Sequence, residues 1–160
     1  MTRSGARLAA LVRIVTGLIF VVLGTSKVFG EFVHGGFAAA VKGMIKDSWP
    51  VWRELLRSVV LPIAHVFGWV VAVGEIALGL GLLLGFWTQV VAAGGALLML
   101  SILLSQSYAG PGASLEKWVM AGLTTKFALL LLLLLAAADA GRVWGLDGRV
   151  VGTRKGPVRR

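Results

Sequence analysis

Long runs of apolar residues, separated by short polar connections, dominate this chain. Four runs reach the roughly 20 residues that a helix needs to cross the hydrocarbon core of a bilayer. They cover residues 8–29, 62–86, 88–107 and 118–138. Only Trp87 separates the second run from the third, which predicts a tight hairpin between them. The pattern therefore predicts an all-α membrane protein, a bundle of four transmembrane helices.

The connection between the first two runs, residues 30–61, is long enough to hold structure of its own. Apolar and charged residues alternate within it at helical spacing in two stretches, which predicts two short amphipathic helices along the membrane surface, with tryptophans at headgroup depth. Asp47 or Ser48 is expected to cap the second helix, with Pro50 in its first turn. This segment is either a structural lid, a docking surface for a soluble partner or the rim of a lipid-accessible pocket.

Composition agrees with a membrane protein, because 58% of the 160 residues are hydrophobic and only 14% are charged. A soluble domain has no way to cover so much apolar surface. The chain is therefore expected to form one membrane domain over residues 1–148, followed by a basic tail over residues 149–160. Contact with membrane lipids is the first interaction that this composition implies.

The net charge of +9 is concentrated at the two ends of the chain. Nine of the 16 basic residues lie there: Arg3, Arg7, Arg13, Arg142, Arg149, Arg154, Lys155, Arg159 and Arg160. By the positive-inside rule, both termini of a four-span protein in the cell (inner) membrane are then cytoplasmic. No nucleic-acid partner is expected, because a reading module and interleaved aromatic residues are both missing.

Several redox and metal chemistries are excluded by residue types. The chain contains no cysteine, so thiol–disulfide exchange, iron–sulfur clusters and thiolate zinc sites are ruled out. His34 and His65 are its only imidazoles, and their spacing does not place them on one helix face. We therefore expect no metal site, and a haem is disfavoured.

Three charged residues lie deep within the apolar runs: Lys27, Glu75 and Lys126. A charge at such depth costs roughly 2.5–3.5 kcal/mol on insertion scales, so it is rare unless it is paired or functional. With the N-terminus inside, all three fall in the outer half of the bundle, where they are expected to meet in a buried polar pocket. Such a cluster either fixes helix register or binds a ligand. A quinone suits it, because Lys27 or Lys126 can donate to a carbonyl while Glu75 handles the proton.

Two further patterns carry more specific information. Arg13, Gly17, Phe20, Gly24 and Lys27 are spaced by three or four residues, which lines them along one stripe of the first helix. The second run contains the sequence GEIALGLGLLLG, which includes Gly74, Glu75 and Gly79. A lysine in the fourth run, Lys126, and an exit segment with Gly141, Arg142 and Asp147 complete the set.

As an ordered set, these motifs resemble the DoxX family of small four-span membrane proteins. The resemblance covers residues 8–148 and assigns the family's motif positions to Arg13, Gly17, Gly24, Gly74, Gly79, Arg142 and Asp147 besides the three deep charges. Some relatives are described as subunits of quinone-linked oxidoreductases. The resemblance therefore implies a membrane subunit that interacts with quinone or lipid in a redox complex, without assigning a catalytic role to any residue.

Two other interpretations stay open at the level of the sequence. The first is a non-catalytic membrane scaffold or assembly partner, in which the buried charges only fix helix packing. The second is transport of a small molecule, which four short spans without discontinuous helices do not favour. The redox interpretation needs an electron-donating protein partner, because the chain encodes no redox centre of its own. Self-association and the identity of the substrate are left open.

Overall fold

The computed structural model of this chain describes residues 3–138 and 140–148, and every regular element in them is helical. The predicted basic tail, residues 149–160, lies outside this part. The long helices are α1 (Arg3–Phe29), α4 (Ala64–Leu84), α5 (Thr88–Gln106) and α7 (Leu123–Ala137). The shorter helices and turns are η1 (Phe32–Gly36), α2 (Phe37–Met44), η2 (Ile45–Asp47), α3 (Pro50–Leu55), η3 (Leu56–Val60), α6 (Leu115–Met120) and η4 (Ala140–Arg142).

Three helices, α1, α4 and α5, are long and apolar enough to cross a membrane, and α7 is a shorter apolar helix of 15 residues. Large aliphatic side chains stay exposed along their outer faces, for example Leu18 on α1 and Leu97 on α5. Such faces are stable against lipid and not against water. The predicted all-α membrane bundle is therefore confirmed.

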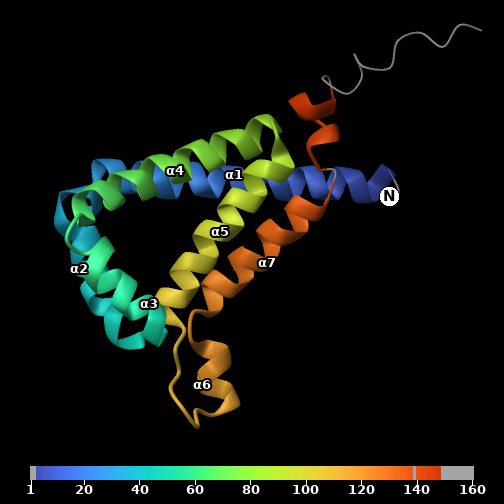
Figure 1. Cartoon of the computed structure of the whole chain (residues 1–160). Helices are drawn as coiled ribbons and strands as arrows, with labels where there is room; N and C mark the ends of the chain where they lie inside the picture. Colours follow the sequence, from blue (N-terminus) through green and yellow to red (C-terminus); the bar gives the residue numbers. More distant parts are fainter. Residues whose placement is uncertain (1–2, 139, 149–160) are drawn as a thin grey trace, which may run out of the picture.

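The helices associate as two pairs. Figure 1 shows α1 alongside α4, and α5 alongside α7, with the second pair crossing the first at an angle. A core of Phe20, Leu82, Ala96, Met99 and Leu132 fills the region where the pairs meet. At the opposite end of α4 and α5, the pairs diverge and the α2–α3 segment lies beside them. Helix α2 contacts both α4 and α5 there.

The fourth apolar run differs from the expectation of one uninterrupted span over residues 118–138. It is divided into α6 and α7, because Ala121 is extended and Gly122 has a left-handed backbone with φ of 67°. Glycine adopts this conformation without steric cost. The fourth apolar run therefore forms a discontinuous helix. The sequence predicts no discontinuous helix, and that prediction is the argument given above against transport.

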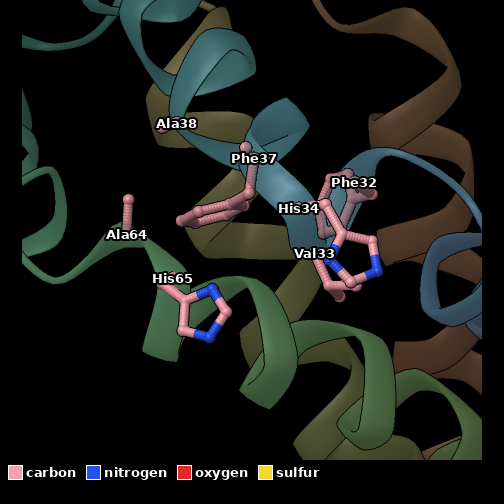
Figure 2. Close-up of a pocket in the computed structure, with 8 residues that line it drawn as sticks. Phe32, Val33, His34, Phe37, Ala38, Ala64 and His65 are labelled. Atoms are coloured by element: carbon pink, nitrogen blue, oxygen red, sulfur yellow. The ribbon is translucent and has the colours of Figure 1, made fainter.

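The segment between α1 and α4 contains the two short amphipathic helices expected there, α2 and α3. The helical path is broken before α2, where His34 and Gly35 have non-helical backbones, and Figure 2 shows this turn facing the start of α4. Pro50 occupies the first turn of α3, as predicted. The expected cap is wrong: Trp49 precedes the helix without a side-chain cap, and the Ser48 hydroxyl donates backward to the Ile45 carbonyl oxygen at 2.7 Å.

Candidate functional site

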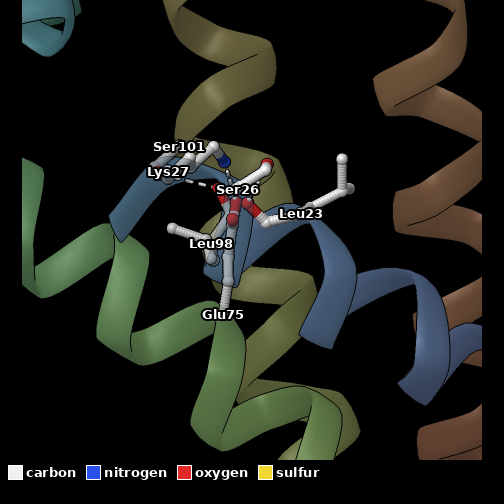
Figure 3. Close-up of polar contacts among 6 residues, drawn as sticks. All are labelled: Leu23, Ser26, Lys27, Glu75, Leu98 and Ser101. Carbon is white, nitrogen blue, oxygen red and sulfur yellow. Dashed lines mark hydrogen bonds and ion pairs between the residues drawn. The ribbon is translucent and has the colours of Figure 1, made fainter. Parts of the chain in front are cut away.

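The central feature of the site is an ion pair between Lys27 of α1 and Glu75 of α4. Figure 3 shows the two side chains directed toward each other between the helices. Glu75 is 2% exposed and the Lys27 side chain 23%, so the carboxylate lies behind the ammonium group. The second carboxylate oxygen, Oε2 of Glu75, is buried and has no hydrogen-bond partner among the described residues. Burial of an ion pair is tolerable only when each charge faces its counter-ion.

Glycines set the distance between α1 and α4. A β-carbon added at Gly24 would lie 2.8 Å from the Ile76 nitrogen, and one at Gly79 would lie 2.7 Å from the Gly17 carbonyl oxygen. The two backbones therefore touch along this stripe, as small residues permit in lipid. Gly74 differs, because an added β-carbon there meets nothing within 4 Å. The glycine contacts bring α1 close enough to α4 for Lys27 to reach Glu75.

A cavity of about 470 Å³ adjoins this ion pair. Its walls come from η1, α2, α3 and η3 on one side and from α4 and α5 on the other, and they are predominantly apolar. Lys27, Ser101 and Ser105 are its polar lining residues. Ser101 and Ser105 donate within α5, to the carbonyl oxygens of Leu98 and Ser101. Lys27 is therefore the charged group that a molecule in the cavity would meet.

The α2–α3 segment lines one side of this cavity, and we call it the roof; it is attached to the end of α5 by hydrogen bonds. The indole nitrogen of Trp52 donates to the Ser105 hydroxyl at 2.9 Å, and that of Trp49 donates to the Ser107 hydroxyl at 3.2 Å. Two backbone hydrogen bonds reinforce the contact, from Trp49 to the carbonyl of Leu104 and from Tyr108 to that of Asp47. Trp52 is partly buried, and the indole N–H of a tryptophan in such a position usually finds a partner of this kind. These four hydrogen bonds therefore anchor the α2–α3 segment to the end of α5.

Lys126 does not join Lys27 and Glu75, contrary to the three-charge cluster expected from the sequence. Its ammonium group donates to the Trp118 carbonyl oxygen at 2.5 Å and lies 4.1 Å from the centroid of the Trp118 ring. The break at Gly122 exposes the last carbonyl groups of α6, and a cation at a helix C-terminus satisfies them. The ion pair therefore contains two of the three predicted residues.

The other polar motif positions form a second cluster at the α4–α5 turn, which we call the hairpin hub: Arg13, Gly85, Trp87, Thr88 and Asp147. Arg13 is fully buried and donates to the carbonyl oxygen of Leu82 at 2.6 Å and to that of Trp144 at 3.1 Å.

Asp147 accepts hydrogen bonds from the backbone N–H groups of Trp87 at 2.8 Å and Thr88 at 3.0 Å. These donors open α5 and have no partner within that helix, so the carboxylate caps it. Arg142 ends η4, and its side chain is outside the described part of the structure. Arg13 and Asp147 thus lie in the hairpin hub, at the other end of the bundle from the Lys27–Glu75 ion pair.

The structure brings together two residues that sequence spacing left apart, His34 and His65. Both line a pocket of about 390 Å³ beside the roof, with phenylalanine and alanine around them. Neither imidazole makes a hydrogen bond within the described residues, and no group of three or more His, Asp or Glu side chains there is arranged for a metal ion. The two histidines come close because the chain turns at Gly35. Helical periodicity in the sequence could not predict this turn.

Comparison with known proteins gives one positive result. The family model described as DoxX matches residues 8–106, more than half of the chain. The matched segment includes Arg13, Lys27 and Glu75, together with the glycines that hold α1 against α4. No curated protein and no solved structure matches the chain.

Proposed function

The chain belongs to the DoxX family of integral membrane proteins, and we propose that it is a membrane subunit that binds a lipid-soluble quinone in the cavity beside Lys27. The observation that carries this proposal is the lining of the cavity: an apolar enclosure with one cationic donor, backed by a buried carboxylate. Ligand sites commonly combine apolar walls with a few placed polar groups. A quinone has the matching chemistry, an apolar ring and tail with carbonyl oxygens.

The ion pair can supply a hydrogen-bond donor and a proton acceptor, the two groups that quinone reduction needs from the protein. Lys27 faces the cavity and can donate a hydrogen bond to a carbonyl oxygen, and a charge-assisted bond of this kind is about twice as strong as a neutral one. Glu75 has a free oxygen, Oε2, that can hold a proton behind the ammonium group. Reduction of a quinone consumes two electrons and two protons. The electrons must come from a redox partner protein.

A second candidate function is a membrane scaffold, and one observation favours it. Lys27 and Glu75 neutralise each other without any ligand, and buried pairs can serve to specify helix register. The two proposals differ in whether anything occupies the cavity. Under either proposal the protein lies in the cell (inner) membrane with both termini cytoplasmic, which the basic residues near the ends support.

Extraction and chromatography of quinone from purified protein separates the two functions. The test variant is Lys27→Met with Glu75→Leu, because removing both charges leaves no uncompensated ion in the bundle. Loss of a charge-assisted hydrogen bond, about 1.5–3 kcal/mol, should lower the affinity for quinone at least tenfold. Lys42→Met is the matched control, because Lys42 is exposed on α2 and does not line the cavity.

Both variants must be folded and monodisperse for this comparison. Wild type and Lys42→Met are expected to retain quinone, and the double variant is expected to lose it. A wild-type protein that carries no quinone, and takes none up when it is supplied in nanodiscs, would leave the scaffold function in its place.

A further inference from the structure

The cavity beside Lys27 is not closed on every side, and the exposure of its lining residues locates the open part. All but two of the residues that line it are buried or partly buried. The two exposed ones are Leu55, 38% exposed, and Val59, 45% exposed. They lie four residues apart, at the end of α3 and in η3, and so share one face of this helical stretch. A side chain that both lines a cavity and is exposed lies at its rim, so this face forms the mouth of the cavity.

The surroundings of the mouth are those of a face in contact with lipid. Val51, four residues before Leu55, is 87% exposed and extends the same line of apolar side chains. Glu54 and Ser58, which are also exposed, form a polar line beside it. Separate apolar and polar faces are typical of a helix that lies in the membrane interface with its apolar face in the acyl region. The mouth is on the apolar face, so the cavity opens toward the bilayer.

The lining of the cavity is amphipathic in the same sense. Its charged residue, Lys27, comes from α1, whereas α3 and η3 contribute the apolar mouth residues. The volume of about 470 Å³ falls within the range of about 300–1,000 Å³ that encloses a drug-sized molecule. This volume suits a head group and the beginning of a tail. A longer tail attached to a head group at Lys27 has to leave through the mouth.

We propose that Leu55 and Val59 form a portal between the cavity and the bilayer, and that the ligand is a long-tailed quinone whose tail passes between these two residues into lipid. This inference rests on the function proposed above. Such a portal lets the head group reach Lys27 without leaving the membrane. The part of the tail outside the portal remains in lipid, where it is as well solvated as before binding. Leu55 and Val59 are therefore expected to determine which tails the site accepts.

The test compares two quinones that share one benzoquinone head group, the first with a methyl and the second with a decyl substituent. Binding to protein in quinone-free nanodiscs is followed by equilibrium dialysis, and empty nanodiscs give the partition into lipid to be subtracted. Val59→Trp and Leu55→Trp add bulk at the portal. Val51→Trp is the matched control, because Val51 lies on the same apolar line and does not line the cavity. Far-ultraviolet circular dichroism and gel filtration verify that each variant is folded.

Added bulk at an occupied contact typically lowers affinity by about fivefold or more. We expect this loss for the decyl quinone in both portal variants, with unchanged affinity for the methyl quinone. Val51→Trp should alter neither affinity. If one portal variant does not fold, the other carries the comparison.

Two results would overturn the portal and leave the proposed function standing. One is wild-type affinity for the decyl quinone in the portal variants, and the other is an equal loss for both quinones. A wild-type protein that binds neither quinone overturns the proposed function and the portal together.

Discussion

The closeness of α1 and α4 leads to a sharp prediction at Gly79. Alanine at this position would bring its β-carbon to 2.7 Å from both the Gly17 carbonyl oxygen and the Val21 backbone nitrogen. Ordinary van der Waals contacts of a β-carbon begin near 3.4 Å. Because both obstructing atoms belong to the α1 backbone, no side-chain rotation can relieve the clash. The two helices must instead separate by about 0.7 Å, the difference between these distances.

The magnitude follows from two opposed terms. Overpacking a well-packed contact typically costs about 1–3 kcal/mol, because neighbouring atoms must shift. Alanine also favours the helix over glycine by about 0.5–1 kcal/mol, which offsets part of the cost. Taken at their midpoints, about 2 and about 0.75 kcal/mol, the two terms leave a net destabilisation of about 1 kcal/mol for Gly79→Ala. For a chain of this length each kcal/mol corresponds to roughly 2–4 °C, so the melting temperature should fall by about 2–5 °C.

Gly74→Ala is the matched control for this prediction. It lies on the same helix in the same sequence motif, but an added β-carbon there meets nothing within 4 Å. Its melting temperature should equal that of the wild type or rise slightly. Intrinsic tryptophan fluorescence can follow thermal unfolding in detergent, since the chain has six tryptophans. Equal stability of Gly79→Ala and wild type, or an equal loss in both variants, would refute the assignment of the α1–α4 contact to these glycines.

Two more predictions concern the helix cap in the hairpin hub and the orientation of the chain in the membrane. Asp147→Ala should lower the free energy of unfolding by about 0.5–2 kcal/mol, because the first N–H groups of α5 lose their acceptor. Asp147→Asn should have a smaller effect. Equal melting temperatures for wild type and both variants would exclude the cap. Single cysteines in this cysteine-free chain test the orientation: Lys42→Cys should react with an impermeant maleimide added outside the cell, and Arg154→Cys should not. The opposite labelling would reverse the proposed topology.

The parts of the fold that were predictable depend on local periodicity. The stripe from Arg13 to Lys27 was assigned to one helix face, and the structure buries Arg13 and Phe20 and places the glycines of this stripe against α4. A helix repeats every 3.6 residues, so sequence alone determines which residues share a face. The ion pair between Lys27 and Glu75 was likewise expected, because two deep opposite charges in a small bundle are stabilised by meeting.

Contacts that depend on a turn could not be derived in the same way. Asp147 caps a helix that begins 59 residues earlier, and nothing in the spacing of Asp147 and Thr88 reports that contact. His34 and His65 share a pocket only because the chain bends at Gly35. A single glycine permits such a bend without requiring it. The position of Gly35 in the sequence therefore does not predict which residues the bend brings together.

Lys126 shows how one such turn changes the interpretation of a charge. On an uninterrupted helix its depth would suit contact with Glu75, and the surrounding leucines give no sign of a break. Once Gly122 interrupts the helix, the terminal carbonyls of α6 become the nearest acceptors, and Lys126 donates to that of Trp118. A cation so placed offsets the negative end of a helix and needs no carboxylate. Glu75 then has Lys27 as its ion-pair partner, and its second carboxylate oxygen, Oε2, stays buried without a hydrogen-bond partner among the described residues.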